Sequence, residues 1–214
     1  RRFRADHLLM EAGYDPSGWS LDEMGECVKA NNLVSPDGNE LSAPRRFNMM
    51  FETQVGATEG EEGRTYLRPE TAQGMFVNFK NIVDSLYPDM PFGLAQIGKA
   101  FRNEIAPRDF LFRAREFEQM EVEYFVRSEE WQEAFEMWRE ILWSYIDDLG
   151  LSRERVHELE VPEEDRAHYS KRTIDFEYNY PFGRKELYGL AYRTDYDLKH
   201  HSEESGVALT YTDK

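Results

Sequence analysis

Cysteine is almost absent from this sequence, because Cys27 is the only one among 214 residues. A single cysteine excludes a disulfide within the chain and is typical of a reducing compartment. Long apolar runs are also missing, and none approaches the ~20 residues that a membrane-spanning helix needs. The charged N-terminus, Arg1 to Asp6, has no apolar segment behind it and does not read as a secretory signal. These absences predict a cytoplasmic protein with no membrane segment. The first residue is not methionine, so we expect the chain to begin inside a longer gene product.

Positive charge is scarce: 26 Lys and Arg residues face 42 Asp and Glu residues, and the net charge is −16. This balance argues against broad, non-specific nucleic-acid binding, which depends on cations that neutralise phosphates. Hydrophobic residues at 40% and aromatic residues at 14% indicate a globular chain with a core of its own. The few cations are concentrated, since four arginines gather in one short stretch: Arg102, Arg108, Arg113 and Arg115.

Local patterns predict an α+β fold with an antiparallel sheet. Helical spacing of apolar residues predicts helices over residues 21–30, 69–86 and 129–149, and alternation predicts strands over 93–104 and 116–126. A second antiparallel strand pair is expected within residues 173–198, around the turn at 181–183. Residues 1–45 are rich in turn formers and are interpreted as an insertion joined to a core at 46–214. A solvated helix end is the simplest interpretation of His200 and His201.

The strand at 116–126 has an unusual face. Phe117, Gln119, Glu121 and Glu123 alternate with the residues between them and therefore share one side. Two carboxylates on one side are odd for a simple core strand. The pattern favours a strand that forms the base of a polar pocket.

The stretch 101–121 combines Phe101-Arg102-Asn103-Glu104, a loop, and a return that runs from Arg113 through Phe117 to Glu121. Residues two or four apart on a strand share a face, so a hairpin can present a cation, an anion, an aromatic ring and a second anion to one pocket. Arginine binds phosphate or carboxylate oxygens through two parallel hydrogen bonds, and an aromatic ring stacks on a base. The spacing therefore suits a pocket for ATP and a free amino acid.

This stretch resembles motif 2 of class II aminoacyl-tRNA synthetases. Other segments resemble those of the glycyl-tRNA synthetase family, in the same order along the chain: residues 3–9, 46–51, 67–74, 117–121 and 193–198. The run Arg68-Pro69-Glu70-Thr71-Ala72-Gln73-Gly74 is the most family-specific of them. The resemblance extends over nearly the whole chain and implies a class II synthetase-like antiparallel sheet flanked by helices.

The resemblance implies a role for each matching residue. The set that would bind ATP is Arg102, Asn103, Glu104, Phe112, Arg113, Phe117, Glu186 and Leu187. The set that would bind glycine is Glu70, Arg102, Phe117, Gln119 and Glu121. Arg102 would be the catalytic residue, in contact with both the ATP α-phosphate and the glycine carboxylate. Arg108 would meet the tRNA acceptor end, and Glu186 would hold Mg²⁺ through ATP.

The activity implied is that of a glycine–tRNA ligase: ATP activates glycine to glycyl-adenylate, and tRNA(Gly) accepts the glycyl group. Positioning and charge stabilisation suffice for this reaction, so no nucleophilic side chain is required. Motif 1, motif 3 and the anticodon-binding domain have no counterpart in the chain. We therefore expect a partial catalytic domain with poor activity in isolation, taken from a full-length homodimer.

The same residues argue against three other interpretations. A non-enzymatic derivative, such as a polymerase accessory protein, is disfavoured because the ATP-binding residues are retained. A synthetase for another amino acid is disfavoured by Glu70 together with Glu121. A zinc site is not supported, because the histidines are widely spread and Cys27 is alone.

Overall fold

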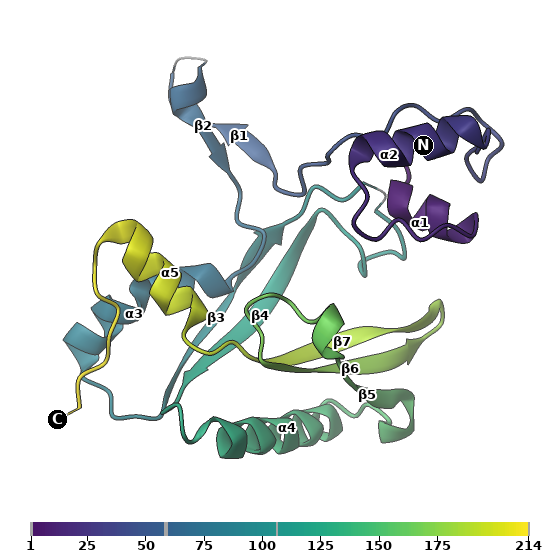
Figure 1. Cartoon of the computed structure of the whole chain (residues 1–214). Coiled ribbons are helices and arrows are strands. Elements are labelled where there is room, and N and C mark those ends of the chain that lie inside the picture. Colours follow the sequence, from purple (N-terminus) through teal and green to yellow (C-terminus); the bar gives the residue numbers. More distant parts are fainter. Residues whose placement is uncertain (1, 58–59, 106, 214) are drawn as a thin grey trace. The chain divides into compact units, whose positions relative to one another are not determined.

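The computed structural model describes residues 2–57, 60–105 and 107–213 (Figure 1). Position 106, within the stretch that resembles motif 2, lies outside the described residues. The chain divides into two compact units, one of Arg1–Pro69 with Ala100–Phe117 and one of Glu70–Lys99 with Glu118–Lys214. That residues 1–45 form an insertion stays a prediction.

The first unit begins with two short helices, α1 (Ala5–Glu11) and α2 (Leu21–Ala30), that pack on each other. The predicted helix at 21–30 is confirmed. It starts where Ser20 and Glu23 exchange hydrogen bonds, since the Glu23 backbone N–H donates to Ser20 Oγ and the Ser20 N–H donates to the Glu23 carboxylate. A small antiparallel pair follows, β1 (Glu52–Gln54) with β2 (Arg64–Tyr66), and the 3₁₀ turn η1 (Glu61–Gly63) leads into β2.

Strands β3 (Phe92–Phe101) and β4 (Glu116–Phe125) pair as one two-stranded sheet, which confirms the adjacent strands predicted from alternation. In β4 the odd-numbered residues from Phe117 to Glu123 are half-buried and the even-numbered ones from Glu116 to Val122 are exposed. The predicted polar face is therefore the covered face. Helix α3 (Ala72–Leu86) lies against this hairpin, and the rings of Phe79, Phe92 and Phe125 meet at centroid distances of 4.8–6.0 Å.

The prediction that the helix begins at Pro69 is wrong by one turn, because α3 begins at Ala72. The backbone N–H of Thr71 donates instead to Glu121 Oε2, 2.8 Å away on β4. This contact holds residues 70 and 71 outside the helix and beside the polar face of β4.

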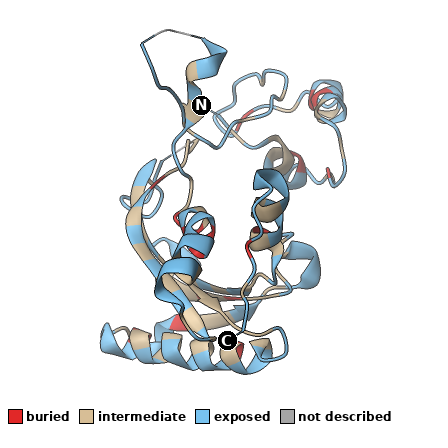
Figure 2. Cartoon of the chain, turned by 90° about the vertical axis from the view of Figure 1, so that its left-hand side faces the viewer, coloured by how far each residue is buried: buried red, intermediate tan, exposed pale blue. Residues whose placement is uncertain are grey.

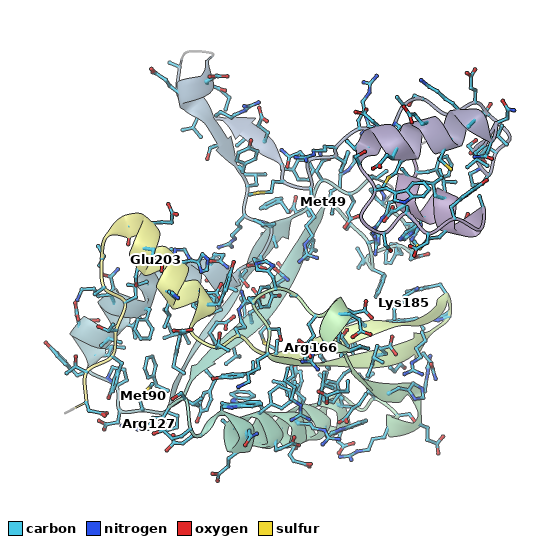
Figure 3. All side chains as sticks on the ribbon, in the orientation of Figure 1. Met49, Met90, Arg127, Arg166, Lys185 and Glu203 are labelled. Atoms are coloured by element: carbon cyan, nitrogen blue, oxygen red, sulfur yellow. The ribbon has the colours of Figure 1, made fainter. Side chains whose placement is uncertain are left out.

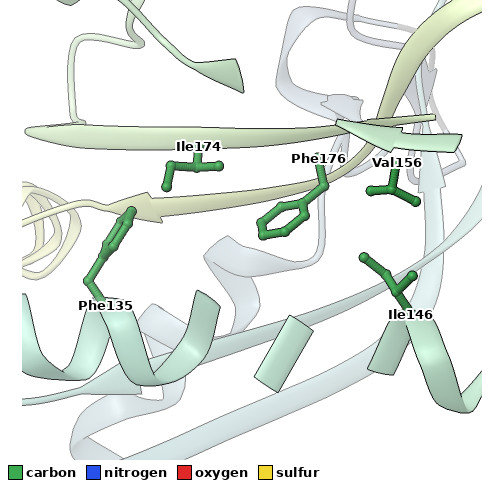
Figure 4. Packing of buried hydrophobic residues seen from close by; sticks show 5 residues of the cluster. All are labelled: Phe135, Ile146, Val156, Ile174 and Phe176. Atoms are coloured by element: carbon green, nitrogen blue, oxygen red, sulfur yellow. The ribbon is translucent and has the colours of Figure 1, made fainter. Parts of the chain in front are cut away.

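The main core of the second unit lies between helix α4 (Trp131–Asp148) and a three-stranded antiparallel sheet in the order β5-β6-β7. The strands are β5 (Val156–Glu160), β6 (Arg172–Tyr180) and β7 (Gly183–Tyr192), with 3₁₀ turns η2 (Arg153–Arg155) and η3 (Glu163–Asp165) before and after β5. Figure 4 shows the five residues that fill the space between helix and sheet: Phe135, Ile146, Val156, Ile174 and Phe176. The helix predicted at 129–149 is confirmed within two residues at each end.

Strand β7 is shorter than predicted. It ends at Tyr192, and the chain turns through Thr194, whose φ of 56° lies in the left-handed region and breaks the extended backbone. Helix α5 (Tyr196–Ser205) follows and lies beside α3 (Figure 1). The second strand pair thus runs over residues 172–192, and residues 196–198 are helical.

Figure 2 colours the chain by burial; among the described residues, α3 carries four buried apolar side chains, Ala72, Met75, Phe76 and Phe79. Among the residues that the structure describes, no helix combines the length and the apolar character needed to cross a membrane.

Candidate active site

Arg102 is held by three contacts within the first unit. Its backbone N–H donates to the Arg115 carbonyl at 2.9 Å, and its Nε donates to the Pro69 carbonyl at 3.2 Å. Its guanidinium lies 5.2 Å from the centre of the Phe117 ring. The structure therefore brings together the predicted catalytic cation and the predicted aromatic ring. Among the described residues, no hydrogen bond from the terminal nitrogens of Arg102 is present, and these nitrogens can donate to an anion.

Glu104 and Arg113 form a second pair in the same unit. The side chain of Glu104 is 14% exposed, and its carboxylate lies 3.6 Å from a terminal nitrogen of Arg113. Glu104 also accepts a hydrogen bond from Arg115 Nε through its backbone carbonyl, at 3.2 Å. A nearly buried carboxylate beside a half-exposed arginine suits the two predicted roles. Glu104 would accept a hydrogen bond from the adenine amine, and Arg113 would bind the terminal phosphates.

The prediction that Arg102 and Glu104 share a face of one strand is wrong. Strand β3 ends at Phe101, and the Glu104 N–H donates to the Arg102 carbonyl at 2.7 Å, which is a tight turn rather than a strand. The cause is Asn103, whose backbone N–H donates to the Met49 carbonyl at 2.8 Å and whose Nδ2 donates to the Asn48 carbonyl at 3.1 Å. Met49 is labelled in Figure 3. These contacts draw the chain out of the ladder with β4.

Arg108 lies at the tip of the loop, where an antiparallel bridge to Arg113 closes a turn through Asp109 and Phe110. Both turn residues have positive φ, 57° and 54°, so the backbone is held in a tight left-handed bend. The side chain of Arg108 is 65% exposed, and Phe112 is also exposed. The two predicted contacts at this tip, with tRNA for Arg108 and with ATP for Phe112, stay predictions.

In the second unit, Glu121 contacts Thr71, and Glu70 precedes Thr71 in the chain. Glu121 Oε2 accepts hydrogen bonds from both the backbone N–H and the hydroxyl of Thr71, a residue with no exposed surface. Glu70 Oε1 accepts from Gln73 Nε2 at 3.0 Å. Two half-buried carboxylates are thus anchored at the junction of β4 and α3, and each can accept further hydrogen bonds from a cation.

Gln119 lies on the same covered face of β4. Its Oε1 is buried, and among the described residues it has no hydrogen-bond partner. A buried acceptor without a donor is uncommon in proteins and marks a position where a bound ligand or water would supply the hydrogen. This position suits the glycine-binding role predicted for Gln119.

Glu123 completes the face and was not assigned a role from the sequence. Burial raises the pKa of its carboxyl to about 7, although nearby Arg193 opposes the change, and the negative charges of Glu121, Asp197 and Glu70 add to it. A cavity of about 70 Å³ opens beside it, lined by Phe76, Glu123, Tyr124, Phe125, Arg193, Thr194, Asp197 and Leu198.

Arg193 and Asp197 form the best-buried ion pair that the structure describes, with side chains 17% and 6% exposed. Arg193 donates to both carboxylate oxygens, at 2.8 and 2.9 Å, and lies 3.7 Å from the centre of the Tyr169 ring. Burial would raise the pKa of Asp197, but the hydrogen bonds from Arg193 and Gln73 outweigh it and lower the pKa. The i,i+4 rule for helix surfaces does not predict this pair, because Arg193 precedes α5 and the left-handed Thr194 lies between it and the helix.

The interpretation of His200 and His201 as a solvated helix end is wrong for His201. This residue is half-buried within α5, and its Nε2 lies 2.8 Å from Gln73 Oε1 on α3.

Glu186 and Leu187 lie on β7, one and two residues beyond Lys185, which Figure 3 labels on the β6–β7 hairpin. The side chain of Glu186 lies over Gly189: a Cβ at that glycine would meet Glu186 Oε1 at 3.3 Å and Asp175 Oδ1 at 3.8 Å. Burial, followed by the charge of Glu177, raises the pKa of Asp175. The carboxylates of Glu186 and Asp175 thus lie close to Gly189, and that of Asp175 is partly desolvated. Carboxylate oxygens are ligands that suit Mg²⁺ bound to ATP phosphates. The described residues contain no group of three or more histidine, cysteine, aspartate or glutamate side chains placed to hold a metal by themselves.

The chain is also similar in sequence to known proteins. Residues 40–199 match the family model described as "tRNA synthetase class II core domain (G, H, P, S and T)". The chain is 47% identical over 220 residues to the glycine–tRNA ligase of Caldanaerobacter subterraneus subsp. tengcongensis, which covers 99% of the chain and 48% of that protein. It is 47% identical over 221 residues to that of Clostridium tetani, covering 99% and 48%, and 43% identical over 221 residues to that of Geobacillus thermodenitrificans, covering 100% and 47%. The chain spans about half the length of the curated relatives it matches.

Proposed function

Because the chain belongs to the tRNA synthetase class II core domain family, we propose that it forms the central part of the catalytic domain of a glycine–tRNA ligase. The relatives named glycine–tRNA ligase, similar along nearly the whole chain, support this choice within the family. The observations that carry the proposal are two contacts within the first unit, Arg102 with Phe117 and Arg113 with Glu104, which offer cations, a ring and a carboxylate of the kinds that can bind ATP.

In the proposed reaction an oxygen of the glycine carboxylate attacks the α-phosphorus of ATP. A new oxygen–phosphorus bond forms, the bond to the bridging oxygen breaks, and pyrophosphate leaves with the electron pair. Arg102 binds the α-phosphate and the carboxylate, and its fixed charge stabilises the negative charge that develops between them. Arg113 binds the terminal phosphates, Phe117 stacks on adenine, and Glu104 accepts from the adenine amine. The roles of Asn103, Phe112 and Leu187 are to shape the ATP site around them.

Glu70 and Glu121 bind the glycine ammonium, and Gln119 supplies an acceptor beside them. The hydrogen bonds from Thr71 and Gln73 support this role, because they fix both carboxylates before the ligand arrives. Exclusion gives the specificity: side chains around the ammonium leave no room for a methyl group on the substrate. The adenylate then passes the glycyl group to a ribose hydroxyl of tRNA(Gly), with Arg108 near the acceptor end.

Magnesium would supply charge neutralisation at the phosphates when bound with ATP. Glu186, with Asp175 beside it over Gly189, is the carboxylate proposed to hold it. We also propose that the full-length protein is a cytoplasmic homodimer. The family resemblance supports the dimer, and the single cysteine is compatible with a reducing compartment.

The test is amino-acid-dependent ATP–pyrophosphate exchange by the full-length protein, with glycine, alanine, serine, threonine, proline and histidine supplied one at a time. We expect exchange with glycine and a rate at least a hundredfold lower with the others. Exchange with another of these amino acids would change the substrate and keep the enzyme class. No exchange with any of them, in a folded protein that binds ATP, would favour a non-enzymatic derivative.

A further inference from the structure

Gln73 connects a proposed substrate-binding carboxylate to helix α5. Its Nε2 donates to Glu70 Oε1 at 3.0 Å and to Asp197 Oδ1 at 3.1 Å, and its Oε1 lies 2.8 Å from His201 Nε2. Glu70 is three residues away, whereas the two α5 residues lie more than a hundred positions along the chain. All four residues belong to the same compact unit.

The chemistry of the partners fixes the orientation of the amide. Glu70 and Asp197 present carboxylate oxygens, which accept hydrogen bonds when ionised, so the NH₂ group of Gln73 must face them. The amide oxygen then faces His201, and because that oxygen only accepts, Nε2 of His201 must carry a hydrogen. Three neighbours thus determine a single orientation of Gln73, and a flipped amide would place its oxygen against two carboxylates.

Asp197 makes this arrangement rigid. It is buried, and Arg193 holds both of its oxygens. Arg193 is itself held against the ring of Tyr169. The hydrogen bonds from Arg193 and Gln73 keep Asp197 an ionised acceptor, as the lowered pKa of this carboxyl indicates. Gln73 is therefore fixed from α5 before any ligand binds.

We propose that Gln73 is a positioning residue for glycine recognition, held in place by Asp197 and His201 and acting through Glu70. The inference rests on the proposed function. Gln73 donates a hydrogen bond to Oε1 of Glu70. No described residue donates to Oε2 of Glu70, and this oxygen can accept a hydrogen bond from the glycine ammonium group. A carboxylate held in one rotamer binds a small cation better than a mobile one, because less freedom is lost on binding. Glycine offers only its ammonium and carboxylate, so its affinity should depend strongly on this preorganisation.

The proposal makes the network specific to the amino acid and not to ATP. Gln73→Leu removes the donor to Glu70 and the acceptor for His201 while keeping a side chain of similar size. In ATP–pyrophosphate exchange by the full-length protein, we expect KM for glycine to rise about tenfold or more, the loss typical of a hydrogen bond to a charged group. KM for ATP should stay within about twofold. The matched control is Gln132→Leu, an exposed glutamine on α4.

His201 provides a second test that does not alter Gln73. His201→Leu removes the hydrogen that orients the amide, and KM for glycine should rise severalfold. His201→Gln retains a donor and should return KM to within about twofold of the wild-type value. If the network only holds α3 against α5, a different result is expected. His201→Leu and His201→Gln would then both lower the melting temperature, and KM for glycine and KM for ATP would change together.

Each outcome decides the matter. A selective rise in KM for glycine in Gln73→Leu, with rescue in His201→Gln, supports the inference. An unchanged KM for glycine, or equal rises for glycine and ATP, overturns it while leaving the proposed function intact. If Gln73→Leu does not fold, the His201 pair alone decides. If the wild-type protein shows no exchange with glycine, the proposed function fails and the inference with it.

Discussion

Replacing Glu123 by glutamine should stabilise the protein increasingly as the pH rises. Burial raises the pKa of this carboxyl from an ordinary 4.5 to about 7 in the folded state. Between these values the folded protein holds a proton that the unfolded chain has released. The wild-type stability therefore falls as the pH rises from about 4.5 to about 7, and it changes no further from this cause above that.

The expected size follows from the difference of about 2.5 in pKa. At ~1.4 kcal/mol for each pKa unit, the charged form of Glu123 lowers the free energy of unfolding by about 3 kcal/mol once it is fully ionised. Glutamine has nearly the same shape and never ionises. The advantage of Glu123→Gln should therefore grow from about 1 kcal/mol or less at pH 5 to about 3 kcal/mol at pH 8.

The assay is urea unfolding of the full-length protein and the variant, followed by tryptophan fluorescence at pH 5, 6, 7 and 8. Glu118→Gln is the matched control, since Glu118 lies on the exposed face of the same strand. Its difference from the wild type should not grow with pH. A constant difference between Glu123→Gln and the wild type across this range would refute the reasoning, because it would show that the Glu123 carboxyl is not desolvated.

Three further predictions follow from single contacts. Arg102→Ala should lower glycine-dependent ATP–pyrophosphate exchange by about 10²–10³, the usual loss when one preorganised charge donor is removed; a rate within threefold of the wild type would assign Arg102 a structural role. Phe176→Ala empties the centre of the core between α4 and the sheet and should lower the free energy of unfolding by about 3–5 kcal/mol in urea, whereas a loss below about 1 kcal/mol would mean that this core is not closely packed. Ser20→Ala removes the cap of α2 and should cost about 0.5–2 kcal/mol by the same measurement, and no change would show that the cap does not contribute to stability.

The polar face of β4 could be predicted from the sequence because strand periodicity is a local property. Alternation alone placed Phe117, Gln119, Glu121 and Glu123 on one side, and their half-burial follows that order. Helix α4 was predicted on the same basis, since apolar residues at helical spacing indicate a helix without knowledge of its partner.

The errors arose where distant residues decide the local structure. The turn at Arg102–Glu104 depends on carbonyls of residues 48 and 49, and the late start of α3 depends on Glu121. Neither partner is visible in the local pattern. His201 was misjudged for the same reason, because the hydrogen bond to Gln73 joins positions far apart in the chain.

The contacts of Gln73 with α5 could not be predicted from the sequence pattern. The segments 67–74 and 193–198 were both identified as family-like, but nothing in either indicated that they touch. Only the packing of α3 beside α5 brings Gln73 to Asp197. A residue that acts through another residue is therefore inferred from the structure, whereas the residues expected to contact the ligand directly follow from the family resemblance, and their roles stay predictions.

The most direct test of the central proposal is aminoacylation of unfractionated tRNA by the full-length protein, with each radiolabelled amino acid supplied separately in the presence of ATP and Mg²⁺. We expect that glycine alone is attached and that, within the tRNA mixture, tRNA(Gly) carries all of the label. Attachment of a different amino acid would contradict the assignment of Glu70 and Glu121 to the glycine ammonium. No attachment at all, by a folded protein that binds ATP, would contradict the assignment of the chain to a glycine–tRNA ligase.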